Sequence, residues 1–153
     1  MNRMNSRQRL ALRTFSLGIE ELKASGVIRS HRYLGDIAEF LCADAFGIDL
    51  ATNLRETGHD GLRGAVKVQI KYGGGKKRNM DLGHPDTYEE LYVVLGRESV
   101  IRTSDHNDDY VVYKLTADEV RRMKARSGKH SCGISRFSGP PDHVISLEDL
   151  GDV

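Results

Sequence analysis

Hydrophobic residues recur with helical spacing in two segments of the first third of the chain. In residues 6–24 they fall three or four positions apart, and Ser25-Gly26 follows as a stop signal. Residues 31–46 repeat the pattern with a wider apolar stripe, and Gly47 stands at the natural end. We therefore predict two helices, the first of them an added arm over about 6–25. The two stripes are Leu12, Phe15, Ile19 and Leu22, then Leu34, Ile37, Ala38, Leu41, Cys42, Ala45 and Phe46.

The second predicted helix carries two acids that the helical wheel separates. At roughly 100° per residue, Asp36 lies almost opposite the centre of the apolar stripe, whereas Glu39 lies at its border beside Phe46. We expect Asp36 to face water and Glu39 to reach the edge of the core. If one of these acids serves a site, the pattern favours Glu39.

The middle of the chain changes to the alternation of a strand. Between positions 66 and 72, apolar side chains alternate with Lys67, Gln69 and Lys71. The continuous apolar run 91–95 predicts a strand buried on both faces. Further strands are expected at 48–51, 110–115 and 144–147, with 100–101 as an extension of the sheet.

A third helix is expected to begin at Thr116, because Glu119 completes a capping box, and to end at Ser127-Gly128. The remaining segments, including 129–143, read as irregular. The order of helix, helix, strands and helix predicts an α/β or α+β fold with a central mixed sheet flanked by helices. At 153 residues, we expect a single domain over 1–153.

Composition adds a basic segment to this picture. The net charge is only +1, yet residues 61–80 contain no acid and six basic side chains: Arg63, Lys67, Lys71, Lys76, Lys77 and Arg78. Such a segment fits a polyanionic partner or an ordinary solvated face, and composition alone does not separate the two. With two distant cysteines and no apolar run of membrane-spanning length, we expect a cytoplasmic protein that is not associated with a membrane.

Four residues could together carry phosphodiester chemistry. Asp60 lies in an acidic turn just before the alternating strand, and Gln69 and Lys71, two positions apart, share one face of that strand. Hydrolysis of a phosphodiester needs oxygen ligands for Mg²⁺ and a cationic or basic group near the attacking water. Glu39 is the candidate distant carboxylate. The alternative is a half-buried strand with a polar outer face and a nearby acidic turn.

These residues also carry a family resemblance. Gly35-Asp36-Ile37-Ala38-Glu39-Phe40, Gly58-His59-Asp60-Gly61 and Val68-Gln69-Ile70-Lys71 together resemble the PD-(D/E)xK superfamily of restriction-endonuclease-like nucleases, over roughly residues 33–126. His59 stands where the family name has Pro. Gln69 replaces the usual acid, as in Mrr-like restriction enzymes, which removes a negative charge that Glu39 would partly restore.

The resemblance implies a restriction-endonuclease-like fold and a role for each site residue. Asp60, Gln69 and Glu39 would hold Mg²⁺ (or Mn²⁺), and Lys71 would act near the attacking water. The nucleic-acid-binding residues would be Lys67, Lys76, Lys77 and Arg78, which contact backbone phosphates and set affinity rather than sequence preference.

The sequence thus predicts a Mg²⁺-dependent DNA endonuclease of a restriction, defence or repair type, without a small-molecule cofactor and acting as a homodimer. A second hypothesis is a catalytically inactive nuclease-fold protein that binds nucleic acid or a protein partner. A third is a purely structural domain that docks through its first helix. Walker, EF-hand and zinc-finger patterns are each broken at required positions.

Overall fold

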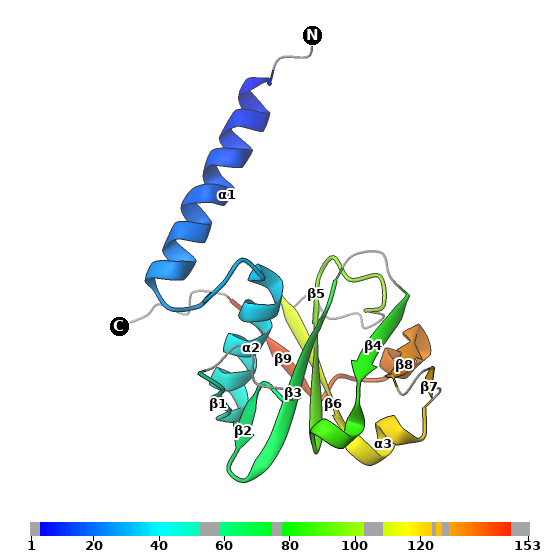
Figure 1. Ribbon diagram of the computed structural model, residues 1–153. Helices are drawn as coiled ribbons and strands as arrows, with labels where there is room; N and C mark the ends of the chain where they lie inside the picture. The colour runs from blue at the N-terminus through cyan, green and yellow to red at the C-terminus, as the bar shows by residue number, and fades with distance from the viewer. Residues whose placement is uncertain are drawn as a thin grey trace.

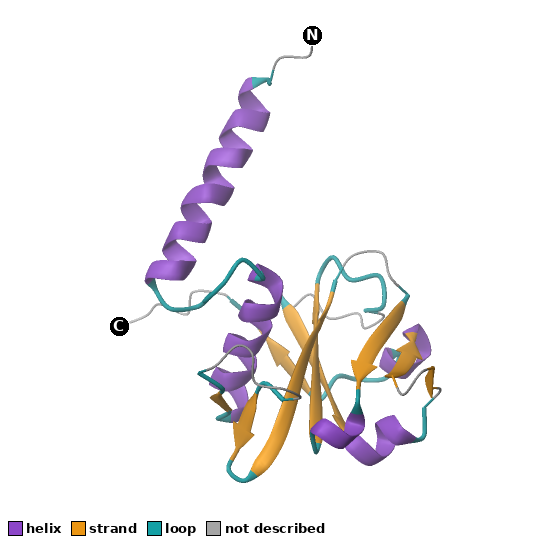
Figure 2. Cartoon of the chain, in the orientation of Figure 1, coloured by secondary structure: helices purple, strands orange, loops and turns teal. Residues whose placement is uncertain are grey.

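A mixed six-stranded sheet forms the centre of the protein. The computed structural model describes residues 4–52, 59–74, 78–102, 109–123, 125–126 and 129–147. The large sheet has the strand order β1-β2-β3-β5-β6-β9, and a small sheet has the order β4-β8-β7 (Figures 1 and 2). The strands of the large sheet are β1 (Asp49–Leu50), β2 (Gly61–Arg63), β3 (Val66–Gly73), β5 (Glu90–Gly96), β6 (Tyr110–Thr116) and β9 (His143–Ile145).

Helix α1 (Ser6–Ala24) has the bounds expected from its sequence and projects away from the sheet (Figure 1). Its first turn is closed by a capping box, in which Asn5 and Gln8 each bond the backbone of the other. None of its residues is buried, and four of its large apolar side chains are more than half exposed. Its apolar stripe therefore does not enter the core of this chain. The four exposed side chains are Leu10, Leu12, Phe15 and Leu17.

Helix α2 (Tyr33–Phe46) begins two residues later than expected and ends where predicted. Gly47 stops it in the left-handed conformation, with φ of 66°, which glycine adopts without steric cost. The helix packs on one face of the large sheet through Ala38 and Cys42, which contact the inward side chains of β3, β5 and β6. Those strand residues are Val68, Ile70, Tyr92, Val94 and Val112.

The large sheet is mixed, as predicted. β3 pairs antiparallel with β2 and parallel with β5, and β5 pairs antiparallel with β6. The run 91–95 lies in β5 and is fully buried, because α2 covers one of its faces and a second apolar cluster covers the other. The parallel pairing requires a crossover from β3 to β5.

The crossover from β3 to β5 passes through β4 (Asn79–Gly83) and the 3₁₀ turn η1 (Pro85–Thr87). It packs with α3 (Ala117–Arg121) and the 3₁₀ turn η2 (Ile134–Phe137) against the face of the sheet opposite α2. Leu82 of β4 and Phe137 of η2 are fully buried there. The protein thus has three layers, with α2 on one side of the large sheet and the β4-containing layer on the other (Figure 2).

The small sheet was not predicted. It joins β4, β7 (Ala125–Arg126) and β8 (Lys129–Gly133), of which β7 and β8 lie in segments expected to be helical or irregular. The sequence of β8 has no apolar alternation that would predict a strand. Its backbone is held in a strand by antiparallel pairing with β4.

Two other sequence expectations were wrong. Residues 100–101 form a turn after β5 rather than a continuation of the sheet, and Ile101 is buried there against the second apolar cluster. Helix α3 starts at the predicted cap, Thr116, but ends at Arg121. Its last turn tightens because the Met123 N–H donates to the Val120 carbonyl oxygen three residues back, and β7 then pairs with β8. Within the described residues, no helix is long and apolar enough to cross a membrane.

Candidate metal and phosphodiester site

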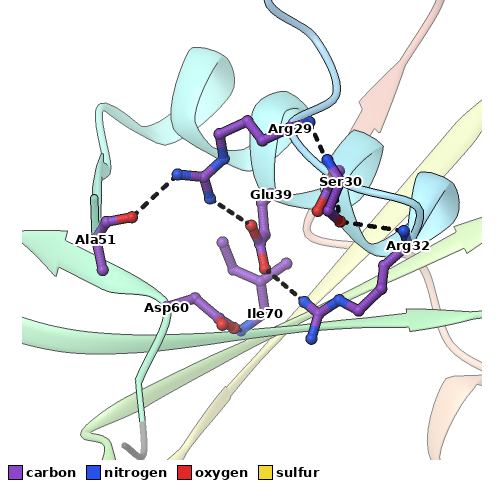
Figure 3. Close-up of polar contacts among 8 residues, drawn as sticks. Arg29, Ser30, Arg32, Glu39, Ala51, Asp60 and Ile70 are labelled. Atoms are coloured by element: carbon purple, nitrogen blue, oxygen red, sulfur yellow. Dashed lines mark hydrogen bonds and ion pairs between the residues drawn. The ribbon is translucent and has the colours of Figure 1, made fainter. Parts of the chain in front are cut away.

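Glu39 points inward from α2, as its position on the helical wheel predicts. The residue is only 5% exposed, and it forms ion pairs with two arginines from the turn before the helix. Arg29 Nη2 lies 2.9 Å from Oε2, and Arg32 Nη2 lies 3.5 Å from Oε1 (Figure 3). Glu39 is therefore a buried carboxylate held by two guanidinium groups.

Asp36 does not face water, which corrects the expectation from the helical wheel. It is 2% exposed, and its Oδ2 accepts hydrogen bonds from the backbone N–H groups of Arg29 and Ser30 and from the Ser30 hydroxyl. Burial raises the pKa of this carboxyl, but the three hydrogen bonds and the charge of Arg32 more than offset it, so the pKa is lowered. The chain preceding α2 folds back over the polar side of the helix, and the helical wheel contains no information about that segment.

Asp60 lies at the point where β2 separates from β3. Its Oδ2 accepts a 2.7 Å hydrogen bond from the Ile70 N–H, and its own N–H donates to the Val68 carbonyl oxygen at 2.8 Å. The carboxylate thus caps a backbone donor of β3 that β2 leaves unpaired. The residue after it must be small, because a Cβ on Gly61 would lie 2.5 Å from the Asp49 carbonyl oxygen.

Figure 3 shows the carboxyl groups of Glu39 and Asp60 next to each other. Burial raises the pKa of Glu39, and the negative charge of Asp60 raises it further against the opposing effect of the arginines. Burial likewise raises the pKa of Asp60, although the Ile70 N–H and the charges of Lys71 and Arg32 act in the opposite direction. Two neighbouring carboxylates with raised pKa values form a place where a cation would be stabilised.

Gln69 and Lys71 lie on the opposite face of β3 from α2. They are in register with Leu91 and Val93 of β5, whose side chains belong to the second apolar cluster. Lys71 lines a pocket of about 230 Å³ beside β4, together with Tyr72, Gly73, Gly74, Asn79, Met80, Asp81 and Ile101. Its charge still acts on Asp60, whose pKa it lowers.

The structure therefore brings two of the four predicted site residues into direct proximity, Glu39 and Asp60. Lys71 acts on Asp60 through its charge from the other face of the strand. For Gln69, no hydrogen bond or ion pair to the two acids is found within the described part of the chain. Among the same residues, no group of three or more His, Cys, Asp or Glu side chains gathers around one point.

Sequence reasoning missed Arg29 and Arg32. Arg32 and Glu39 are seven residues apart, a spacing that places two residues on the same side of a helix that continues through both. A search for basic residues in the turn preceding an inward-facing acid would have found both arginines.

The predicted nucleic-acid-binding residues are only partly described. Lys67 on β3 and Arg78 before β4 are both exposed. Lys76 and Lys77, like Gly58 of the acidic turn, lie outside the described residues. The prediction of a basic loop after Lys71 therefore stays a prediction.

Cys42 lies close enough to Glu39 and Asp60 for their charges to act on it, and it is unsuited to act as a nucleophile. The side chain is fully buried, and burial together with the charges of Asp60 and Glu39 raises the pKa of its thiol to about 12. It functions here as a small apolar residue of the α2 interface.

Comparison with known proteins adds no assignment to this geometry: no protein-family model matches the chain, and no curated protein matches it significantly. The class of the molecule is therefore defined by its fold, a mixed α/β protein in which the buried Glu39 and the partly buried Asp60 lie next to each other beside a mixed sheet.

Proposed function

We propose that the protein is a metal-dependent DNA endonuclease of the PD-(D/E)xK type. The observation that carries this proposal is the pairing of two acids, the buried Glu39 from a helix and the partly buried Asp60 from the start of a hairpin, within electrostatic range of Lys71 on the next strand. An acid on the helix, an acid before the strand and a lysine on the strand follow one another in the order that the superfamily shows.

The acid pair fits a divalent metal by the chemistry of its donors. Glu39 and Asp60 offer oxygen ligands, and burial together with the charge of Asp60 raises the pKa of Glu39. Oxygen is the ligand type that Mg²⁺ and Mn²⁺ prefer. A bound Mg²⁺ would supply localised positive charge that favours ionisation of an attacking water and offsets charge developing on the phosphate. Gln69, the third predicted ligand, would contribute a neutral oxygen only from the face of β3 opposite α2, where the strand places its side chain.

In this proposal Lys71 supports the reaction through its positive charge. Burial raises the pKa of Asp60, and the charge of Lys71 opposes that rise and so favours the ionised carboxylate that binds a metal. The same charge would stabilise the additional negative charge of the transition state. Lys67, Lys76, Lys77 and Arg78 would contact the DNA backbone, and cutting both strands of a duplex would be achieved by a homodimer.

Cleavage of plasmid, linear and branched DNA with Mg²⁺ tests the activity. We expect Asp60→Asn and Lys71→Met each to reduce cleavage at least about 100-fold, since each removes a charge from the reacting centre. Asp44→Asn, which removes an exposed acid from the same helix as Glu39, is the matched control and should leave cleavage unchanged. Full activity of both site variants would overturn the proposal.

A catalytically inactive nucleic-acid-binding protein is the second candidate, and one observation favours it. Glu39 is already neutralised by Arg29 and Arg32, so the site has cationic partners without a metal. Calorimetric titration with Mg²⁺ and with Mn²⁺ separates the two candidates. Absence of metal binding together with salt-sensitive DNA binding would establish the inactive form.

A further inference from the structure

We propose that Arg29 and Arg32 are the phosphate-binding residues of this site and that Glu39 holds them in place until DNA binds. The inference rests on the proposed function. It adds two residues to the predicted nucleic-acid-binding residues, and it places their contact with the DNA backbone beside Glu39 and Asp60. It is carried by the ion pairs with Glu39, by the anchoring of the turn and by the charge balance of the cluster.

The turn before α2 holds the side chains of Arg29 and Arg32 beside Glu39. Asp36 fixes its backbone by accepting from the N–H groups of Arg29 and Ser30 at 2.9 and 2.7 Å. Arg29 is held further by a 3.0 Å hydrogen bond from Nη1 to the Ala51 carbonyl oxygen, next to the β1 strand. The turn thus has a fixed position relative to the acid pair (Figure 3).

The two arginines differ in how tightly they are held. The Arg29 side chain is 32% exposed and makes two contacts of hydrogen-bond length. The Arg32 side chain is 70% exposed, and it forms an ion pair with Glu39 at 3.5 Å. Arg32 is therefore the more easily displaced of the two, because its side chain is mostly solvated and its contact with Glu39 is the longer one. Arg29 stays near the site as a fixed donor.

Charge balance indicates what these guanidinium groups would bind. The cluster contains three carboxylates, Asp36, Glu39 and Asp60, and three cationic side chains that act on them, Arg29, Arg32 and Lys71. A divalent cation bound by Glu39 and Asp60 would leave this cluster with two positive charges in excess. A phosphodiester supplies the missing anion, and the planar guanidinium matches two phosphate oxygens at once.

DNA binding measured in EDTA over a range of salt concentrations tests this assignment without reference to cleavage. We expect Arg32→Gln to lower the slope of log affinity against log salt by about 1, the effect of losing one phosphate contact. Arg32→Lys keeps the charge and should keep the slope. Arg122→Gln, at the end of α3 on the other side of the molecule, is the matched control and should bind as wild type does.

Glu39→Gln gives an independent test, because it releases both arginines. We expect this variant to bind DNA more tightly than wild type and the gain to disappear in the Glu39→Gln/Arg32→Gln double variant. Asp44→Asn removes the same charge elsewhere on α2 and controls for net charge. A gain in the double variant equal to that of Glu39→Gln would overturn the inference.

The outcomes separate this inference from the nuclease proposal. Binding that depends on Arg32 without any cleavage would support the inference and overturn only the catalytic activity. Cleavage by wild type with salt slopes equal for wild type, Arg32→Gln and Arg122→Gln would overturn the inference alone. Absence of DNA binding by wild type at low salt would overturn both.

Discussion

At the scale of single residues, two acids three positions apart on one helix have different functions. Asp36 fixes the turn that precedes α2, whereas Glu39 faces Asp60 across the edge of the sheet. Their pKa values shift in opposite directions: hydrogen bonds and the charge of Arg32 outweigh burial at Asp36, whereas burial and then the charge of Asp60 raise the pKa of Glu39. Asp36 stabilises the fold, whereas Glu39 places its negative charge close to that of Asp60.

Asp36→Ala should destabilise the protein strongly. The substitution removes a buried carboxylate and leaves the N–H groups of Arg29 and Ser30 without their acceptor in a partly buried turn, which we expect to lower the free energy of unfolding by about 2–4 kcal/mol. Urea denaturation monitored by circular dichroism measures the change. Asp44→Ala, an exposed acid on the same helix, should change stability by no more than about 0.5 kcal/mol. Equal effects of the two variants would contradict the anchoring role of Asp36.

Asp60→Asn should make the metal-free protein more stable at neutral pH. Because the pKa of Asp60 is raised in the folded state, its ionisation disfavours folding, and stability falls as pH rises above its ordinary value of 3.8 through the folded-state value. The amide keeps the acceptor for the Ile70 N–H without the charge. Urea denaturation at pH 7 should therefore show Asp60→Asn to be more stable than wild type.

The pH dependence provides the check on this prediction. Denaturation in EDTA at a series of pH values should show the difference between Asp60→Asn and wild type shrinking toward zero below about pH 4, where the wild-type carboxyl is protonated in both states. A gain that is independent of pH would point to packing rather than to charge.

At the scale of elements, the site depends on the close approach of β1, β2 and the end of α2. Gly61 makes this approach feasible, since a Cβ there would lie 2.8 Å from Ile48 Cγ2 as well as against the Asp49 carbonyl oxygen. Gly61 follows Asp60 directly, so the packing of β2 against β1 and the position of the Asp60 carboxylate are coupled.

Gly61→Ala should therefore cost about 1–3 kcal/mol of stability through overpacking and should also weaken Mg²⁺ binding by moving Asp60. Thermal unfolding and calorimetric titration measure the two effects. Gly18→Ala is the control: a Cβ there meets no atom within 4 Å, and alanine should strengthen the interior of α1 by about 0.5–1 kcal/mol. A stable Gly61→Ala variant with unchanged metal affinity would disprove the coupling.

At the scale of the whole molecule, α1 stands apart from the three packed layers. It buries none of its residues, and its contacts with the rest of the described chain include the hydrogen bonds of its C-terminal turn and the ring contact between Phe15 and Tyr33, with centroids 6.1 Å apart. Folding of the sheet and its covering layers should not depend on this helix.

A chain that starts at Ser25 should fold. We expect its free energy of unfolding to lie within about 1 kcal/mol of the full chain, because little apolar surface is removed from water by α1. Urea denaturation followed by tyrosine fluorescence measures this. An unfolded truncated chain would contradict this prediction and show that the fold depends on α1.

Local patterns in the sequence determined several elements directly. The apolar stripe and Gly47 defined α2, the alternation at 66–72 defined β3, and the capping box at Thr116 defined the start of α3. Each depends on interactions among neighbours in the chain, which periodicity and capping rules describe. The inward position of Glu39 followed from the same geometry.

Tertiary structure alone decided the remaining features. The pairing of β4 with β8, the burial of Asp36 beneath the turn at Arg29 and Ser30, and the two arginines on Glu39 all join segments whose relative position no local pattern contains. The same applies to the placement of Lys71 on the face opposite α2. The sequence alone thus determined which acids could form a site, and only the folded chain brought Glu39 and Asp60 together and placed cations beside them, because charge interactions depend on distance in space rather than on separation along the chain.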